Sequence, residues 1–559
     1  MRVGRLIFII IILFLAAFSI IFRLVYFQTE DKTFLDQQGN SRMVRTVNEH
    51  AFRGKIVDRN GYPLAISTPV DSIWADPKFV ELNNPKTYEV FNLLSLSIDD
   101  KKEILERIKK RLGRYGFVYL KRKVPPYIAE KIEQMEVPGI HLMREYQRYY
   151  PDGEVTAHVV GFTNIDNQGV EGIELVYNNW LDGHSGQYEM WRDLKRNLIK
   201  KTKTIKDKQT GGDIALSIDR QIQYIAYRAL KRSIIENNAI GGSVVVLDAH
   251  TGEVLAMVNQ PSFNPNNLSD SEVASRRNRA ITDVFEPGST IKTISVLAGV
   301  EYGGYSPDDV FDVSPGYYYL NKLPVRDFRN YGELDLRHVM MKSSNVGISR
   351  MLLTMPKETL PNLLRTLGFG RSSGLEAIGE RSGYVPMNMK KVSDFSLATL
   401  SFGYGMNSTA LQLARAYAAL ANGGKLVRPT LLRISDKSQV ESVQVIKPKA
   451  ATQTLDMLTS VVEAPGGTGS KAKIEGYQVA GKTGTVRKPI PGGYATDAYM
   501  GLFAGIIPAD NPNYVIVVVI DDPKGESYGG GTAAAPVFSE IAEQILRLKA
   551  LTPTKLITS

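Results

Sequence analysis

Residues 243–248 (SVVVLD) and 253–258 (EVLAMV) are two short apolar runs that decide the fold of the second half of the chain. Turn-forming residues at 250–252 join them, so the pair predicts a β-hairpin. Residues 514–520 (YVIVVVI) are too continuously apolar for a solvent-facing edge and predict a buried strand. Residues 537–548 place apolar side chains on one face of a closing helix. We therefore expect an α/β domain whose sheet is built from both ends of the block and packs against a large helical insert.

The preceding block, residues 28–208, is polar and rich in short alternating runs. Residues 53–61 (RGKIVDRNG) predict a strand and an Asn-Gly turn, and the returning strand is expected at 64–67. The spacing of apolar residues predicts helices over 99–112 and 127–135. This block is therefore expected to mix helices and strands.

Residues 6–27 form an N-terminal apolar run that is interrupted only by Ser19 and Arg23. A helix needs about 20 residues to cross the hydrocarbon core of a membrane, and this run supplies them if Arg23 snorkels to the interface. Arg2 and Arg5 precede the run, which favours a cytoplasmic N-terminus and an exported body. The sequence predicts a single-pass membrane anchor.

A cleaved signal peptide is the alternative reading of the same run. Ala17 and Ser19 form a weak small-x-small pattern, but the apolar residues 20–22 follow it directly. Cleavage normally requires a polar stretch there, so the sequence favours an uncleaved anchor. No later segment is long and apolar enough to cross the membrane again.

Composition excludes several classes of protein. The chain has 559 residues, of which 43% are hydrophobic and 23% charged, which is typical of a globular protein rather than a disordered one. The absence of cysteine excludes a disulfide scaffold, a thiolate zinc site and a cysteine nucleophile. The net charge of +10 suits nucleic acid, an acidic membrane or an anionic polymer. Because the body is expected to be exported and carries no nucleic-acid-binding motif, no nucleic-acid partner is predicted.

The first of three short motifs is EPGSTIK at 286–292. Ser289 is predicted at a helix N-terminus, with Lys292 one turn later on the same face. There the helix dipole favours developing negative charge, and a neutral amine could take the hydroxyl proton. Neutrality requires burial or a second cation near Lys292. The alternative is a serine cap followed by a surface lysine, and Ser-x-x-Lys alone arises by chance about once or twice in a chain of this length.

The second motif is SSN at 343–345, and the third is KTGT at 482–485. Ser343 would relay a proton and Asn345 would hold a substrate carbonyl, although a turn that caps a helix explains the same residues. In the third motif, flanking valines predict a strand. Lys482 would be the second cation, and the strand edge could bind an extended peptide by β-addition.

The remaining residues of the third motif suit a ligand with a carboxylate. The hydroxyls of Thr483 and Thr485 would bind that carboxylate, and Gly484 would allow close approach. A rival hypothesis is a nucleotide-binding loop, because 476–483 (GYQVAGKT) formally fits the P-loop pattern. A P-loop must run into a helix, whereas 484–493 is too rich in Gly and Pro to form one, so we interpret this match as coincidence.

The order and broad spacing of the three motifs resemble those of the penicillin-recognising serine enzymes. With its flanking stretches, the sequence resembles the class B penicillin-binding proteins of the division-specific, septal type, over nearly its whole length. The stretches that carry the resemblance are 53–59 (RGKIVDR), 148–151 (RYYP), 161–174, 277–280 (RNRA) and 401–405 (SFGYG). The resemblance implies an α/β (α+β) transpeptidase fold with a central antiparallel sheet, flanking helices and an all-helical insert, preceded by an extended α+β pedestal.

The resemblance also implies the residue roles. Ser289 would attack a D-Ala-D-Ala donor peptide, Lys292 would take its proton, and Ser343 would relay a proton to the leaving amine. Asn345 would position the donor, and Thr483 and Thr485 would hold its carboxylate. The backbone amides of Ser289 and Thr485 would form the oxyanion hole. β-Lactam antibiotics would acylate Ser289, and no metal or organic cofactor is implied.

Residues 200–212 lack apolar periodicity and end near a glycine pair, so they are expected to join the two blocks. The expected domains are a cytoplasmic tail (1–5), an anchor (6–27), a non-catalytic pedestal (28–208), a transpeptidase domain (209–549) and a C-terminal tail (550–559). The resemblance implies an inner-membrane protein with a periplasmic catalytic domain. It also implies division-complex partners that include a polytopic glycosyltransferase.

Several other functions remain as alternatives. A serine β-lactamase shares the motifs but usually lacks an anchor and a pedestal. A bifunctional penicillin-binding protein would need a further glycosyltransferase domain, and a membrane β-lactam sensor would need cytoplasmic machinery. A catalytically inactive division scaffold would have lost a motif residue, whereas all are present. The elongation-specific class B transpeptidase is the main alternative, against which the 277–292 stretch and the chain length argue.

Overall fold

The computed structural model describes residues 2–49, 51–192, 198–388, 392–525 and 528–555. The chain divides into two compact units. The smaller comprises Met1–Arg53, Val70–Tyr146 and Asp182–Gly212, and the larger comprises Gly54–Pro69, Gln147–Leu181 and Asp213–Ser559. Parts of the expected pedestal thus pack within the larger unit, and the five domain limits stay predictions. Of the two expected tails, residues 1 and 556–559 lie outside the described residues.

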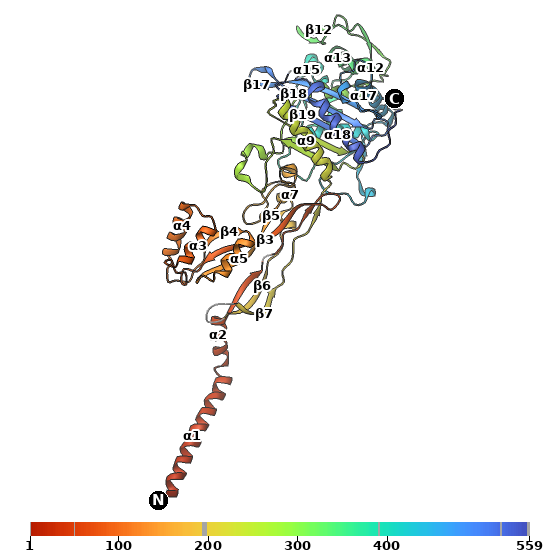
Figure 1. Ribbon diagram of the computed structural model, residues 1–559. Helices are drawn as coiled ribbons and strands as arrows, with labels where there is room; N and C mark the ends of the chain where they lie inside the picture. The colour runs from red at the N-terminus through yellow and green to blue at the C-terminus, as the bar shows by residue number, and fades with distance from the viewer. Residues whose placement is uncertain (1, 50, 193–197, 389–391, 526–527, 556–559) are drawn as a thin grey trace. The chain divides into compact units, whose positions relative to one another are not determined.

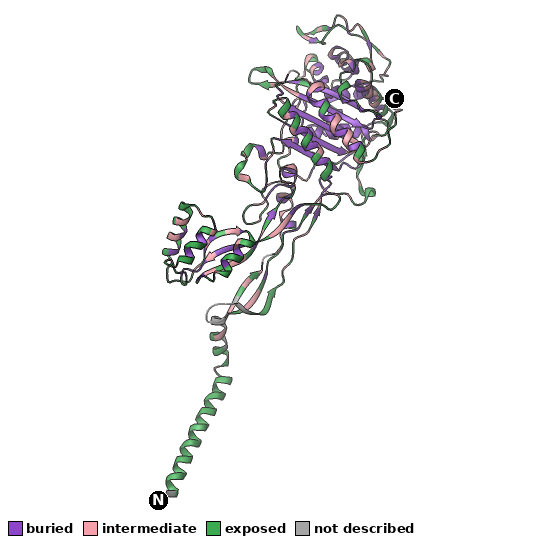
Figure 2. Ribbon diagram, viewed as in Figure 1, coloured by how far each residue is buried: buried purple, intermediate pink, exposed green. Residues whose placement is uncertain are grey.

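A five-stranded antiparallel sheet forms the centre of the larger unit, in the order β10-β9-β19-β18-β17 (Figure 1). Its strands are β9 (Gly241–Asp248), β10 (Val254–Gln260), β17 (Ala480–Ile490), β18 (Gly493–Ile507) and β19 (Tyr514–Asp521). The predicted hairpin of β9 and β10 is confirmed. The predicted buried strand is also confirmed, because β19 is the middle strand and its interior is buried (Figure 2).

The two faces of the sheet bury alternate residues of the same strands, as the period of two requires. Val515 and Val517 of β19 belong to one hydrophobic core, whereas Ile516 and Val518 belong to another. The first core includes residues of α11 (Lys292–Tyr302), α16 (Ala410–Ala421) and α17 (Pro448–Glu463), and the second includes residues of α9 (Arg220–Glu236) and α18 (Ala535–Leu548). The sheet is therefore covered by helices on both faces, and the predicted closing helix is confirmed as α18.

The insert between β10 and β17 was expected to be all-helical, and this expectation is wrong. The insert also contains three two-stranded sheets, formed by short strands within 310–335 and 425–444 that pair with a strand of the same segment. Alternate residues of such a strand are exposed, as in 317–320. The strands are β11 (Val310–Asp312), β12 (Tyr317–Leu320), β13 (Leu323–Arg326), β14 (Glu333–Asp335), β15 (Lys425–Val427) and β16 (Ser442–Gln444). The other helices are α10 (Arg279–Thr282), α12 (Leu336–Lys342), α13 (Asn345–Leu353), α14 (Thr359–Thr366) and α15 (Asp394–Ser401).

The N-terminal part of the larger unit contains the first predicted turn. Strand β2 (Ile56–Val57) pairs antiparallel with the start of β3 (Pro63–Ala75) across Asn60-Gly61, which confirms that hairpin, and parallel with β8 (Ile214–Ala215). Three short helices follow, α6 (Ala157–Val160), α7 (Gly172–Val176) and α8 (Asn178–Leu181). A buried ion pair joins Arg148 to Glu174 of α7 at 2.5 Å.

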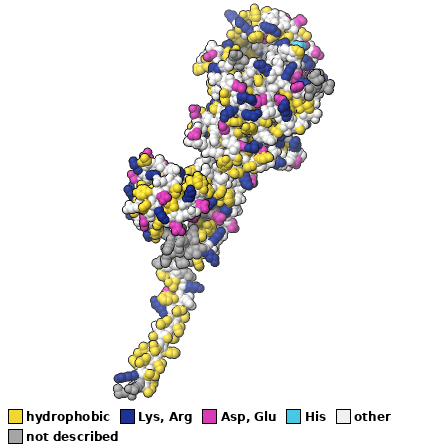
Figure 3. Space-filling model, in the orientation of Figure 1, with side chains coloured by type: hydrophobic (Ala, Val, Ile, Leu, Met, Phe, Trp, Pro, Cys, Tyr) yellow, Lys and Arg dark blue, Asp and Glu magenta, His cyan; other side chains and the backbone are white. Residues whose placement is uncertain are grey.

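The smaller unit begins with α1 (Arg2–Thr29), which confirms the predicted apolar helix. Its segment Val3–Thr29 has a mean hydropathy of 2.9 and none of it is buried by protein. Figure 3 shows this helix covered in hydrophobic side chains. Its length and exposed apolar surface are those of a single-pass membrane anchor.

A helix, α2 (Lys32–Met43), leads from the anchor to the rest of the smaller unit. This contains a three-stranded sheet of β1 (Val44–Glu49), β6 (Gly186–Arg192) and β7 (Leu198–Lys206), and the strands β4 (Val118–Val124) and β5 (Ile140–Tyr149). Helices α3 (Pro85–Leu93), α4 (Ile98–Lys109) and α5 (Pro126–Gln134) complete it, and α4 and α5 confirm two predicted helices. The expected joint at 200–212 stays a prediction: β7 occupies its first half, and the smaller unit ends at Gly212. Residues 200–206 are all exposed, so they carry no apolar face that could reveal the strand.

Candidate active site

Ser289 lies in a single 3₁₀ turn, Gly288–Ile291, that runs directly into α11. This confirms the predicted position of Ser289 at the start of a helix. Gly288 has a φ of +53°, and a side chain there would collide with Val486 of β17. The turn can therefore lie against the strand only because residue 288 is a glycine.

Tyr417 of α16 holds this segment from inside the protein. It is fully buried, its hydroxyl donates to the carbonyl of Thr290 at 2.8 Å, and it shares a hydrogen bond of 2.9 Å with the hydroxyl of Thr293. Thr290 within the turn and Thr293 just after it are thus fixed to the core, which holds the candidate nucleophile in one position.

We expect Tyr417→Phe to lower the free energy of unfolding by about 1 to 3 kcal/mol, because it leaves a buried carbonyl without its donor. Denaturant unfolding of the purified chain would measure the change. Tyr224→Phe is the matched control, since Tyr224 is 52% exposed on α9. Equal unfolding curves for the two variants would contradict the expectation.

Lys292 and Lys482 are buried amines that meet at one hydroxyl. Lys292 is 1% exposed and Lys482 is 0% exposed. Each donates a hydrogen bond of 3.1 Å from Nζ to Ser343 Oγ, and Lys292 also donates to the Ser343 carbonyl at 2.5 Å. The three motifs, separated by more than fifty residues in the sequence, are therefore joined through the Ser343 side chain. With both lone pairs of Ser343 Oγ occupied, its O–H proton is the group left to donate.

The environment of the two lysines favours neutral amines. Burial lowers the pKa of Lys482 to about 7. Burial also lowers the pKa of Lys292 well below its usual value, and the nearby charge of Lys482 lowers that pKa further, as the sequence predicted. Asp327 acts in the opposite direction on the Lys292 pKa. The pair can therefore take up and release a proton near neutral pH, which an exposed lysine does not do.

The second motif forms the sharp turn between α12 and α13. Ser343 has a left-handed backbone with φ +58°, and Ser344 caps α13 by accepting from Gly347 N at 2.9 Å. Helix capping, the alternative explanation of this motif, is thus carried by Ser344. Asn345 is the first residue of α13, and its Nδ2 donates to the Arg326 carbonyl at 2.8 Å.

The third motif lies on β17, which confirms the predicted strand. This strand continues past Thr485 to Ile490 rather than entering a helix, so the P-loop hypothesis is wrong. Among the described residues, β17 is the last strand in the sheet order, so its other edge has no strand neighbour in that sheet. The Thr485 hydroxyl accepts a hydrogen bond from Gly530 N at 3.0 Å, which leaves its own proton available to a ligand.

A cleft of about 850 Å³ opens beside these motifs. Of the predicted residues, Asn345 and Thr485 line it. The other lining residues are mainly aromatic or basic: Phe395, Phe402, Tyr404, Tyr494, Tyr499, Arg326 and Arg487. A cleft of this size, with apolar walls and a few polar groups, suits an organic ligand.

Glu286 is a residue to which the sequence assigned no role. Its Oε1 accepts from Gly405 N at 2.9 Å and from the Tyr494 hydroxyl at 3.2 Å. The ring of Tyr494 also meets Tyr404 edge-on at 5.7 Å. Glu286 thus ties the Ser289 segment to two walls of the cleft. The only sequence signal was its place three residues before Ser289.

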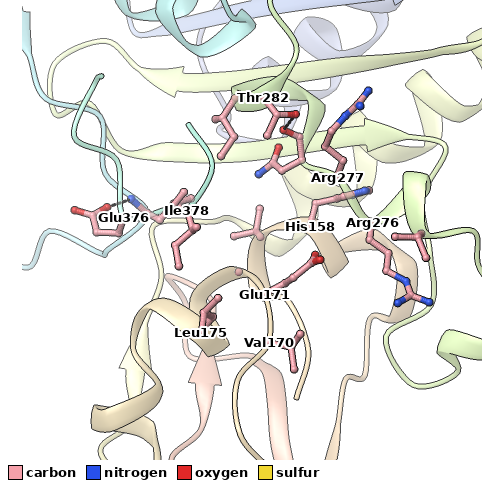
Figure 4. Close-up of a pocket in the computed structure, with 16 residues that line it drawn as sticks. His158, Val170, Glu171, Leu175, Arg276, Arg277, Thr282, Glu376 and Ile378 are labelled. Atoms are coloured by element: carbon pink, nitrogen blue, oxygen red, sulfur yellow. Dashed lines mark hydrogen bonds between the residues drawn. The ribbon is translucent and has the colours of Figure 1, made fainter. Parts of the chain in front are cut away.

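A second cavity, of about 310 Å³, is lined by none of the predicted site residues (Figure 4). Its two arginines have protein partners, since Arg277 pairs with Asp283 at 2.9 Å and Arg276 donates to the Leu268 carbonyl at 2.9 Å. Burial lowers the pKa of His158 in this cavity to about 4. Over the described part of the chain, no three His, Cys, Asp or Glu side chains are grouped to hold a metal ion.

Comparison with protein families matches both blocks of the chain. Residues 242–543 match the penicillin-binding protein transpeptidase domain, and residues 48–216 match the penicillin-binding protein dimerisation domain. These two matches extend over most of the chain that follows the anchor.

Among curated proteins, the chain is 40% identical to the peptidoglycan D,D-transpeptidase FtsI of Escherichia coli over 96% of this chain and 90% of that protein. It is 38% identical to the probable peptidoglycan D,D-transpeptidase PbpC of Pseudomonas aeruginosa, over 99% and 96% respectively. Among solved structures, penicillin-binding protein 3 of Mycobacterium tuberculosis in complex with aztreonam has a TM-score of 0.69 at 27% identity, covering 91% of this chain and 99% of that one.

A peptidoglycan synthetase from Bifidobacterium adolescentis has a TM-score of 0.71 at 26% identity, covering 92% of this chain and 98% of that one. Sequence and fold therefore agree over nearly the full length. The chain belongs to the class B penicillin-binding proteins, the peptidoglycan D,D-transpeptidases.

Proposed function

We propose that this enzyme crosslinks peptidoglycan stem peptides at the division septum through an acyl-enzyme on Ser289. The observation that carries the proposal is its 40% identity, over almost the whole chain, with the D,D-transpeptidase FtsI of Escherichia coli. The meeting of Lys292 and Lys482 at Ser343 supports it, because serine acylation requires a nearby base that is neutral at working pH.

In the first half of the reaction, Ser289 Oγ attacks the carbonyl carbon between the two D-Ala residues of the donor. Lys292 takes the hydroxyl proton. The backbone amides of Ser289 and Thr485 stabilise the oxyanion, and the hydroxyls of Thr483 and Thr485 hold the terminal carboxylate. Gly484 lets the donor approach the strand, and Asn345 orients its peptide group.

The C–N bond then breaks as Ser343 donates a proton to the nitrogen of the leaving D-Ala. In the second half, an amine of another stem peptide attacks the Ser289 ester and loses its proton to the same amine and hydroxyl network. A peptide bond forms and Ser289 regains its proton. β-Lactams would enter the first half as donor mimics and remain attached, because the antibiotic part is not released as a leaving group. No step requires a cofactor.

The surroundings follow from the same proposal. With α1 in the inner membrane and the short N-terminal tail in the cytoplasm, the catalytic domain would stand in the periplasm. Partners would be division-complex proteins, including a polytopic glycosyltransferase that supplies the glycan chain.

Depletion in the native organism tests the septal role. We expect filaments with blocked septa, because wall synthesis along the cell side would continue. Swollen, round cells would instead support the elongation-specific alternative. Complementation by Ser289→Ala would support the inactive-scaffold alternative, and rapid release of penicillin from Ser289 would support the β-lactamase alternative.

A further inference from the structure

Asp327 follows β13 and faces the N-terminus of α13. Its Oδ2 accepts from Ser344 Oγ at 2.5 Å, and its Oδ1 accepts from the backbone amides of Asn345 at 2.5 Å and Val346 at 3.0 Å. One carboxylate therefore binds three successive residues immediately after Ser343. Charge-assisted hydrogen bonds of this kind are about twice as strong as neutral ones.

The residue before Asp327 holds the same motif from a second direction. The Arg326 carbonyl accepts from Asn345 Nδ2 at 2.8 Å, so both the backbone and the side chain of Asn345 are tied to 326–327. One N–H of the Asn345 amide is used in this bond, which leaves its carbonyl oxygen and its second N–H for other partners, and Asn345 lines the cleft. The 326–327 segment thus fixes the position and orientation of this amide.

We infer that Asp327 is a positioning residue for acyl transfer: its carboxylate fixes the turn of residues 343–345, and so holds the Ser343 hydroxyl between the two lysines and the Asn345 amide at the cleft. This inference rests on the proposed roles of Ser343 and Asn345. Ser343 lies in a left-handed conformation that a serine adopts at a cost, and the residues on its C-terminal side are those that Asp327 holds. If Asp327 only capped α13, its bonds to the two backbone amides would suffice, and its further bond to the Ser344 hydroxyl would not be needed.

Asp327 also contributes charge. The charged groups that act on Lys292 are Lys482 from β17 and Asp327 from the segment after β13, and they shift the Lys292 pKa in opposite directions. Removing the negative charge is therefore expected to lower that pKa. Acylation would then persist to lower pH, because Lys292 would remain neutral further into the acid range.

The test measures the rate of acylation by fluorescent penicillin in full-length enzyme, against pH. Asp327→Ala is expected to slow acylation roughly 10- to 100-fold through misplacement of the turn. Asp327→Asn keeps an oxygen for the two amides, so it should recover most of the rate at high pH while the acid limb of the profile moves to lower pH. The final labelled fraction counts folded enzyme, so the rate is read separately from folding.

Asp335→Ala is the matched control, because Asp335 caps the neighbouring helix α12 by accepting from His338 N at 2.7 Å. A structural cap alone predicts equal rates for the two alanine variants and the same pH profile for Asp327→Asn and the unmodified enzyme. Either result would overturn the inference. Absence of labelling in the unmodified enzyme would instead overturn the proposed function itself.

Discussion

Ser289→Ala is expected to abolish covalent labelling by penicillin and to reduce transpeptidation by roughly 10⁶-fold, as loss of a serine nucleophile does in other enzymes. The substitution removes only the hydroxyl oxygen, and the nearby residues Thr290 and Thr293 are held in place by Tyr417. The fold should therefore survive, and the loss should be chemical.

Mass spectrometry after incubation with benzylpenicillin measures the outcome. The unmodified enzyme should gain the mass of one antibiotic, on the peptide that contains Ser289, and the alanine variant should gain none. Ser442→Ala on β16 is the control, since Ser442 is exposed and distant in sequence from the three motifs. Stoichiometric labelling of Ser289→Ala would show that another residue is the nucleophile.

The elements that could be predicted from the sequence are those whose own residues show an apolar run or a regular spacing of apolar side chains. Both faces of β9, β10 and β19 are covered, so these strands contain continuous apolar runs, and such runs predict buried strands directly. Strand β7 could not be predicted in this way, since its lysines and threonines face solvent and neither helix nor strand periodicity marks them. The short strands of the insert were missed because three- and four-residue runs are too short to establish a period.

The motif residues of the site could be predicted, but their geometry could not. The spacing predicted Lys292 one turn after Ser289, and a neutral amine there required burial or a second cation; the structure provides both, burial first and Lys482 second. The sequence did not indicate that both amines would meet at Ser343 Oγ. Asp327 was missed because an aspartate in a connecting segment has no local pattern, and its role depends on contacts with residues seventeen to nineteen positions away.

Lys292→Met is expected to slow acylation by roughly 10²- to 10⁴-fold, the usual cost of losing a general base. The same change should leave the thermal stability equal or higher. Burial and the nearby Lys482 lower the pKa of Lys292 in the folded state. Below the pKa of the unfolded chain, the unfolded chain therefore binds a proton that the folded chain does not, and this lowers the free energy of unfolding. Methionine occupies a similar volume without that penalty and fills the space flexibly.

Opposite responses of rate and stability distinguish a catalytic lysine from a structural one. Lys449→Met on α17 is the control, because Lys449 is exposed and should change neither quantity. A variant that loses stability and acylates at the unmodified rate would show that Lys292 holds the fold together and takes no proton from Ser289.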